Sequence, residues 1–326
     1  MNILLTGGAG YIGSITALNL LDRGHQVTII DSLVNGTYKL IPKEANFLKS
    51  DISDLDQVSK LLKTNKFDII IHFAAFTKVG ESVKFPEKYM ENNYVKAKIF
   101  LNECIKYGLN KIIFSSTGSV YGNIEKEIIK ETDNTNPINP YSASKLKFEN
   151  YLNSLSKKKK CSSVILRYFN VAGADYNLRS GLLTNPDNLI KAICEVASKK
   201  REKLIVNGKD FKTKDGTTVR DFIHVVDLAQ MHLLAAKSLN ETSNISSNIF
   251  NCGYGKGYSI KDVINEMNKI LDLEINFEFG PSRPGDATNT VADVSKFTKN
   301  FNWEPKYNDL NVILKSALDW ENKIKI

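Results

Sequence analysis

Short apolar runs alternate with longer stretches of mixed polarity through the first half of the chain. Continuous apolar runs of this kind are typical of parallel strands that are covered on both faces. They predict strands at Ile3–Leu5, Val27–Ile30, Phe67–Phe73, Lys111–Phe114 and Ser163–Tyr168. The stretches between them predict helices at Tyr11–Arg23, Asp54–Lys63, Pro86–Tyr107 and Tyr141–Leu155. We therefore expect an α/β fold with a doubly wound parallel, Rossmann-like sheet.

Two of these helices carry local start signals. Ser53 stands directly before the helix expected from Asp54, and Asp56 follows three residues later, so we expect Ser53 to cap it. Pro86 suits the first turn of the long helix that it begins, because its missing N–H has no partner there in any case.

A glycine-rich stretch follows the first apolar run at once. Gly7, Gly10 and Gly13 have the spacing G-x-x-G-x-x-G between a predicted strand and a predicted helix, and Tyr11 and Ile12 open that helix. Such glycines allow a tight turn, a close approach of backbone to a pyrophosphate, and close packing of helix on strand. The next strand ends in Asp31, where an acid binds the adenosine ribose hydroxyls and repels a 2′-phosphate. The unit predicts NAD binding.

The pattern loosens after Tyr168. We expect Gly173–Asn188 to be a loop, Leu189–Lys199 a helix, and the polar stretch Lys209–Thr218 a hairpin or excursion. Ser259, with Asp262 three residues later, predicts another helix start.

The expected domains follow from this change of pattern. Residues 1–168 are expected to form the NAD-binding Rossmann domain, with a returning segment near 222–256. Residues 169–326 are expected to form mainly a second, smaller mixed α/β domain that binds substrate.

Composition narrows the function classes. The formal net charge is +8, but the basic residues are spread along the chain and form no stripe interleaved with aromatics, so no nucleic-acid partner is expected. The four cysteines are far apart and form no C-x-x-C pair, so no metal site is expected. The first strand begins by residue 3 and no apolar run approaches 18 residues, which predicts a cytoplasmic protein without a membrane partner.

A tyrosine and a lysine four residues apart are the candidate catalytic pair. On a helix, Tyr141 and Lys145 share one face, and Thr117 ends an upstream strand. A nearby positive charge favours the phenolate form of a tyrosine. His72, His224 and His232 are expected to be structural, because His72 follows an apolar strand and is more often a packed core histidine than a base.

The chain resembles the extended short-chain dehydrogenase/reductase family, and within it the 4-epimerases of UDP-glucose and UDP-galactose. The resemblance runs nearly end to end. It is carried by Gly7–Gly13, Ile71–Ala75, Val79–Ser82, Phe114–Thr117, Val120–Gly122, Pro140–Lys145, Leu166–Asn170 and Thr217–Val225.

The resemblance implies which residues hold NAD. Gly7, Gly10, Tyr11, Ile12 and Gly13 would surround the pyrophosphate, and Asp31 would hold the adenosine ribose. The remaining cofactor contacts would come from Asp51, Ile52, Phe73, Ala74, Ala75, Asn92, Tyr141, Lys145 and Phe169.

It also implies a reaction and a substrate site. Tyr141 would take the proton from the sugar 4-hydroxyl, Thr117 would hydrogen-bond that oxygen, and a transient 4-keto sugar would be reduced on its other face. The substrate contacts would be Thr117, Asn170, Asn188, Leu189, Arg220, Arg283 and Thr290. Thr290 is small, so UDP-GlcNAc and UDP-GalNAc are also expected substrates. A homodimer is expected through the helices at Pro86–Tyr107 and Tyr141–Leu155.

Some positions depart from the family pattern. Thr117 stands where serine is usual, which keeps the hydroxyl. Thr77 stands where many members carry a cofactor-contacting lysine, with Lys78 beside it. Asn207 stands where an aromatic residue often stacks on the uracil.

Two alternatives stay open. A 4,6-dehydratase of the same family would carry Asp-Glu after the active-site threonine, whereas Gly118 and Ser119 follow Thr117 here. A non-catalytic NAD-sensing regulator would have no need of both Tyr141 and Lys145.

Overall fold

A computed structural model describes residues 1–184, 188–242, 244–283 and 286–324. The chain forms two compact units, each made of three segments. The first unit comprises Met1–Val120, Thr135–Arg167 and Ala229–Phe250, and the second comprises Tyr121–Asn134, Tyr168–Leu228 and Asn251–Ile326. The assignment of NAD to residues 1–168 and of substrate to residues 169–326 stays a prediction.

The first unit is built on a seven-stranded sheet with the order β10-β6-β5-β4-β1-β2-β3. Its strands are β1 (Asn2–Thr6), β2 (Gln26–Asp31), β3 (Asn46–Lys49), β4 (Ile69–His72), β5 (Lys111–Thr117), β6 (Ser162–Tyr168) and β10 (Ser247–Cys252). The pairs β2–β3, β1–β2, β1–β4 and β4–β5 are parallel. The order 3-2-1-4-5-6 is that of a doubly wound dinucleotide-binding sheet, which confirms the predicted fold class.

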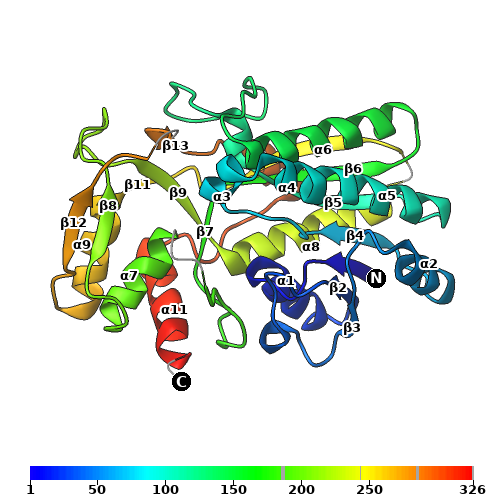
Figure 1. The fold of residues 1–326 in the computed structure, drawn as a ribbon, viewed down its shortest axis with the longest axis horizontal. Helices are drawn as coiled ribbons and strands as arrows, with labels where there is room; N and C mark the ends of the chain where they lie inside the picture. Colours follow the sequence, from blue (N-terminus) through cyan, green and yellow to red (C-terminus); the bar gives the residue numbers. More distant parts are fainter. Residues whose placement is uncertain (185–187, 243, 284–285, 325–326) are drawn as a thin grey trace. The chain divides into compact units, whose positions relative to one another are not determined.

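Helices cover both faces of this sheet (Figure 1). They are α1 (Tyr11–Leu21), α2 (Leu55–Thr64), α3 (Val79–Lys84), α4 (Pro86–Met90), α5 (Ala97–Lys106), α6 (Pro140–Lys157) and α8 (Val225–Glu241), of which residues 229–241 belong to the first unit. Apolar residues on both faces of the strands are buried, as Leu4 and its neighbours Ile3 and Leu5 are. This two-sided burial explains the continuous apolar runs in the sequence.

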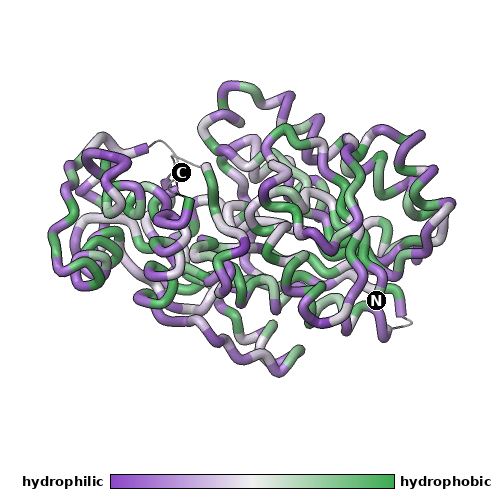
Figure 2. Tube along the Cα trace, turned by 90° about the horizontal axis from the view of Figure 1, so that it is seen from below, coloured by the Kyte–Doolittle hydropathy of each residue, from purple (hydrophilic) through white to green (hydrophobic). Residues whose placement is uncertain are grey.

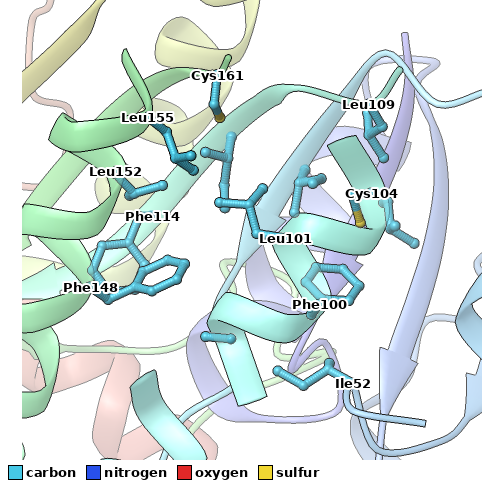
Figure 3. Packing of buried hydrophobic residues seen from close by; sticks show 14 of the residues in the cluster. Ile52, Phe100, Leu101, Cys104, Leu109, Phe114, Phe148, Leu152, Leu155 and Cys161 are labelled. Carbon is cyan, nitrogen blue, oxygen red and sulfur yellow. The ribbon is translucent and has the colours of Figure 1, made fainter. Parts of the chain in front are cut away.

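One buried cluster joins the sheet to α2, α5 and α6 (Figure 3). Phe114 of β5 meets Phe148 of α6 edge to face, with ring centroids 4.8 Å apart. Phe100 and Leu101 of α5 and Leu152 of α6 complete its centre. Because these large side chains are fully or nearly fully buried, they fix α6 against the end of β5.

Two local predictions need correction. Asp54, not Ser53, is the N-cap of α2, and its carboxylate accepts from the Gln57 N–H at 3.2 Å. The Ser53 hydroxyl donates to Asp51 instead, at 2.7 Å. The expected helix 86–107 contains a π-helical segment, Glu91–Lys96, between α4 and α5.

The second unit contains two small sheets. Its strands are β7 (Asn170–Ala172), β8 (Leu204–Asn207), β9 (Val219–His224), β11 (Gly257–Ser259), β12 (Phe277–Gly280) and β13 (Asn289–Thr290). One sheet has the order β11-β9-β13, with β7 also paired to β9, and β12 pairs with β8 in the other.

Four helices accompany these sheets, namely α7 (Leu189–Ala197), α9 (Ile260–Leu271), α10 (Ser295–Phe301) and α11 (Leu310–Lys323). The Ser259–Asp262 capping box predicted for α9 is present, because the Ser259 hydroxyl and the Asp262 carboxylate each accept from the other's backbone N–H. A second core joins α7, α9 and α11 to β8 and β9 through Ile193, Phe222 and Ile313. Figure 2 shows hydrophobic stretches alternating with hydrophilic ones along the chain.

Candidate active site

The glycines after β1 differ in what surrounds them. Gly7 has a φ of +76°, and a Cβ there would lie 2.5 Å from the Ala74 nitrogen. A Cβ at Gly13 would lie 2.3 Å from the Gly7 carbonyl oxygen, so both positions need glycine for the fold itself. At Gly10 the only described atom that a Cβ would meet within 4 Å is that same oxygen, at 3.4 Å. Packing within the protein therefore does not require glycine at position 10. Close approach of a ligand to the backbone would explain why glycine stands there.

The N-terminus of α1 can receive a pyrophosphate. Gly10 is its N-cap residue, and among the described residues no side chain caps this end. The N–H groups of Tyr11 and Ile12 stand in the first turn, whose N–H groups take no part in the intrahelical hydrogen-bond ladder. The first turn holds no acidic residue, so no charge within the helix itself opposes the positive end of its dipole.

Asp31 ends β2 with its carboxylate fixed by backbone. Its two oxygens accept from the Ala9 N–H at 2.9 Å and from the Leu33 N–H at 2.8 Å. Burial raises the pKa of this carboxyl, while the two hydrogen bonds act in the opposite direction. Each oxygen keeps a lone pair for a ribose hydroxyl. The glycine loop, the helix end and Asp31 thus fit NAD.

The expected adenine contacts lie one strand further along. Asp51 accepts from the backbone and side chain of Ser53 and from Lys96 Nζ, which stands 2.6 Å from it. The Lys96 hydrogen bond contributes most to the lowering of the Asp51 pKa, against the effect of burial. Ile52 beside it is buried.

The segment after β4 is held from several sides. The Phe73 N–H donates to the Thr6 carbonyl at 3.0 Å, and its ring lies 4.8 Å from that of His232. Ala74 packs against the Gly7 turn, and Ala75 follows it. Asn92, in the π-helical segment, donates to Asn93 at 3.1 Å.

Tyr141 and Thr117 meet where α6 begins and β5 ends. Asn139 caps α6 by accepting from the Ser142 N–H at 2.9 Å, and Pro140 occupies the first turn, which sets Tyr141 at the start of the helix. Thr117 is the last residue of β5, and its hydroxyl is hydrogen-bonded with the Tyr141 phenol. Burial raises the pKa of Tyr141 to about 12, and the Thr117 bond opposes this rise.

Lys145 lies one turn further along α6 and is only 2% exposed. Its Nζ donates to the Ser115 carbonyl at 2.7 Å and stands 4.9 Å from the centre of the Phe114 ring. Burial lowers the pKa of Lys145 to about 7, and the negative charge of Glu149 acts in the opposite direction. The structure therefore brings together the phenol, hydroxyl and amine that the sequence singled out.

His72 and His224 are packed inside the protein, as the prediction of a structural role for both requires. His72 is buried beside three phenylalanine rings and bonds Thr6 at 2.7 Å. Burial lowers its pKa to about 3, so it is neutral at physiological pH. His224 bonds Ser316 at 3.0 Å and stacks on Tyr307, and burial lowers its pKa to about 4.

Three expected substrate residues share one face of the β9 sheet in the second unit. Thr290 pairs with Arg220, and Asn170 pairs with Phe222, two residues after Arg220. Since paired residues of parallel strands point to the same face and alternate residues share a face, Asn170, Arg220 and Thr290 project together. Burial lowers the pKa of Arg220, and the charge of Asp286 opposes this.

The other expected substrate residues also lie in the second unit. Asn188 caps α7 by accepting from the Lys191 N–H at 3.0 Å, which places Leu189 in the first turn. With its amide oxygen turned towards Arg283, Asn207 accepts from Arg283 Nη2 at 3.0 Å and Nε at 3.2 Å. Asn207 therefore orients this arginine. Phe169 donates its N–H to the Cys252 carbonyl at 3.0 Å.

Three buried polar residues around this site, Glu149, Arg167 and Asn93, are absent from the predicted site. Glu149 lies behind Lys145 and bonds both Ser116 and Arg167. Asn93 bonds the backbone of Phe76 twice and donates to the Ser144 hydroxyl at 3.1 Å. Two features of the sequence point to Glu149 and its partner. Glu149 follows Lys145 by four residues, and Arg167 is the one arginine in the apolar strand β6.

Some features of the sequence find no part in the described site. Thr77 and Lys78 are exposed, and Lys78 stands before α3 with its N–H bonded to Tyr89.

The four cysteines are buried free thiols. Among the described residues no group of His, Cys, Asp and Glu is placed to hold a metal ion. Within the described ranges, no helix has both the length and the apolar character that crossing a bilayer takes.

Comparisons with known proteins bear on this site. The model of the NAD dependent epimerase/dehydratase family matches residues 3–253. The chain is 40% identical over 324 residues to a UDP-glucose 4-epimerase of Halalkalibacterium halodurans, a match that covers 99% of this chain and 96% of the relative.

Two solved structures are similar over nearly the whole chain. UDP-glucose 4-epimerase from Bifidobacterium longum, in complex with NAD⁺ and UDP, has a TM-score of 0.93 at 33% identity, and 99% of each chain is covered. The UDP-Glc/GlcNAc 4-epimerase from Campylobacter jejuni has a TM-score of 0.84 at 43% identity, again with 99% of each chain covered.

Proposed function

The chain belongs to the NAD dependent epimerase/dehydratase family, and on that premise we propose how its residues invert the 4-hydroxyl of UDP-hexoses. The protein is an isomerase of the UDP-glucose 4-epimerase type that uses NAD. One observation carries the assignment of residues. Tyr141 is hydrogen-bonded with Thr117 and stands one helical turn from the buried amine of Lys145.

Tyr141 acts as the general base. Its oxygen takes the proton of the sugar 4-hydroxyl while C4 loses a hydride, and a C4=O bond forms. Bound NAD supplies the reversible hydride acceptance at C4 that this oxidation needs. When the sugar is reduced on its other face, Tyr141 returns its proton to O4, so the proton balance closes within one turnover. Thr117 donates to or accepts from O4 and fixes its position.

Lys145 makes a tyrosine usable as a base. Burial raises the pKa of Tyr141 to about 12 even though the Thr117 hydrogen bond opposes the rise, and this value is far from the operating pH of a general base. A positive charge on Lys145 and the hydrogen bond with Thr117 both favour the phenolate. Lys145 is held for this purpose by the Ser115 carbonyl and by its packing on Phe114.

The residues of the second unit bind the sugar nucleotide. Arg220 and Arg283 hold the diphosphate, for which a guanidinium fork is suited. Asn170, Asn188 and Leu189 contact the sugar nucleotide beside them. The support for this assignment is the shared face of Asn170 and Arg220 and the amide oxygen of Asn207, which accepts from Arg283 and orients it.

The substrate range extends to N-acetylated sugars. Thr290 stands beside Arg220 in the sheet, and a small residue there leaves room for a 2-acetamido group. The Campylobacter jejuni enzyme, at 43% identity, is described as a UDP-Glc/GlcNAc 4-epimerase, which supports this range.

The protein works as a cytoplasmic homodimer. In the first unit, α3, α4 and α5 lie beside α6 (Figure 1). Val83 is 63% exposed and Phe85 is 56% exposed, and a two-fold contact through these helices would cover both. Light scattering at micromolar concentration tests this association, and a monomer mass would exclude it.

Product analysis tests the proposed function. Purified protein is incubated separately with UDP-galactose and UDP-N-acetylgalactosamine, and the sugars are resolved. We expect UDP-glucose and UDP-N-acetylglucosamine. A 4-keto-6-deoxy product would identify a dehydratase instead, although Gly118 and Ser119 after Thr117 supply no carboxyl group for the elimination of water. Bound NAD without turnover of either sugar would identify a regulator.

A further inference from the structure

The end of β5 is joined to α6 by three successive residues. Thr117 is hydrogen-bonded with Tyr141, the Ser115 carbonyl accepts from Lys145, and the Ser116 hydroxyl donates to Glu149. The three helix residues are spaced by four, so they lie on one face of α6. The face that carries the base and the amine therefore continues one turn further, to a carboxylate.

Glu149 is buried with a charged partner. It is 1% exposed, and Arg167 of β6, which is 3% exposed, donates to its two oxygens at 3.1 and 2.6 Å. Removing two charges from water is costly, and packed apolar residues of similar volume would often stabilise as well. The pair stands directly behind Lys145, whose ammonium is a third buried charge. Glu149 thus lies between two cations.

We propose that Glu149 is a positioning residue of the reaction, which keeps the Lys145 amine charged beside Tyr141 and is itself held in place by Arg167 and Ser116. This inference rests on the proposed function, because it acts through the assignment of Tyr141 and Lys145. Arg167 fixes the carboxylate from the opposite side by two hydrogen bonds, and Ser116 ties it to the strand whose next residue is Thr117.

The charged and titratable groups around Lys145 come from several elements. Tyr141 and Glu149 stand on α6, His72 on β4 and Arg167 on β6. From α3 and α4, Glu81 and Tyr89 are bonded to each other, and Tyr89 lies near enough to Tyr141 to interact with it. From the π-helical segment, Lys96 is paired with Asp51.

Of these groups, Glu149 is the one described anion that acts to raise the pKa of Lys145. His72 is neutral above pH 3, and the positive charge of Lys145 helps to lower its pKa. In the proposed function Tyr141 and Lys145, one helical turn apart, act together, so removal of the negative charge lowers the apparent pKa values of both groups. The acid limb of the rate profile, where the pair reaches its active protonation state, then moves to lower pH.

The test is the pH dependence of kcat/KM for UDP-galactose in Glu149→Gln, which keeps an acceptor for Ser116 and removes the charge. We expect the acid limb to move down by about one pH unit and the rate at neutral pH to fall. Glu321→Gln is the matched control, since Glu321 is also buried, is paired with Lys191 at 2.5 Å, and belongs to the second unit. This control is expected to lower Tm and to leave the limb unmoved.

A purely structural role for Glu149 would lower the rate equally at every pH, and an unmoved limb in Glu149→Gln would overturn the inference. Should that variant not fold because Arg167 loses its carboxylate partner, Glu149→Gln with Arg167→Met removes both charges, and its limb is expected to move in the same direction. Tyr141→Phe is measured in parallel. An active Tyr141→Phe would refute the base assignment, whereas an inactive one with an unmoved Glu149→Gln limb refutes only this inference.

Discussion

Gly13 packs directly on Gly7, because a Cβ atom at Gly13 would lie 2.3 Å from the Gly7 carbonyl oxygen, whereas one at Gly10 would meet that oxygen only at 3.4 Å. Gly13 and Gly10 therefore have different roles. Gly13 allows the first helix to approach the turn, and Gly10 leaves open the space in which a pyrophosphate would lie.

Replacing each glycine by alanine separates these two effects. Gly13→Ala is expected to lower the free energy of unfolding by about 1–3 kcal/mol or more, through overpacking against backbone. Gly10→Ala is expected to keep the circular dichroism spectrum and to lose bound NAD. The NAD content of purified protein and urea unfolding measure both. Full NAD content in Gly10→Ala would contradict the expected approach of the pyrophosphate.

Tyr141→Phe is expected to reduce turnover by roughly 100- to 10,000-fold while NAD remains bound, because it removes the group that moves the proton. Tyr151→Phe is a matched control on the same helix, since its hydroxyl bonds Asn102 and takes no part in the site. Turnover is measured by coupling UDP-glucose formation to a detectable product. Near-normal turnover in Tyr141→Phe would mean that another residue is the base.

Thr290→Tyr is expected to lose activity on UDP-N-acetylgalactosamine and to keep activity on UDP-galactose, because the phenol would fill the volume that an acetamido group needs. Thr290→Ser, which stays small, is expected to keep both activities. The ratio of kcat/KM for the two substrates is the measurement. An unchanged ratio in the tyrosine variant would place the 2-substituent elsewhere.

His72 makes the fold sensitive to acid. Its pKa is lowered by burial to about 3 in the folded state, against 6.5 in the unfolded state. Between these values the unfolded chain binds more protons, so stability is lost as pH falls from 6.5 towards 3. At pH 4.5 the loss from this group is roughly 2 to 3 kcal/mol.

A variant isolates that contribution. His72→Gln is expected to show a shallower fall in the free energy of unfolding between pH 7 and 4.5 than the natural chain, measured by urea unfolding. Asp221 acts in the opposite direction, because burial raises its pKa to about 6 and its folded form binds more protons between 3.8 and 6. Asp221 is present in both proteins and cancels in the difference. Parallel pH curves for the two proteins would show that His72 does not titrate on unfolding.

The central sheet and its main helices could be predicted from local pattern. The predicted strand Phe67–Phe73 contains β4, because a strand covered on both faces must be apolar throughout. The predicted helix Tyr141–Leu155 lies within α6. The spacing of Tyr141 and Lys145 was also readable, since four residues on a helix always share a face.

Features that depend on distant partners could not be predicted in this way. Ser53 was the expected cap of α2, but Asp51 takes its hydroxyl, which leaves the capping to Asp54. Glu149 on its own is an ordinary helix glutamate, and only the position of Arg167 on β6 shows that it is a buried, paired charge. The helix α3 contains Gly80, and the Glu81 carboxylate helps to hold it by accepting hydrogen bonds from Lys88 and Tyr89.

The π-helical segment Glu91–Lys96 interrupts the α-helical hydrogen bonding of the long helix from Pro86 to Lys106. Each residue turns an α-helix by about 100°, so one extra residue in a regular α-helix would rotate everything beyond it by that angle. A π-helical turn takes up an extra residue through i→i+5 bonds, so the residues beyond it keep their facing. The irregular turn therefore separates the length of this helix from the direction in which Phe100 and Leu101 point into the core.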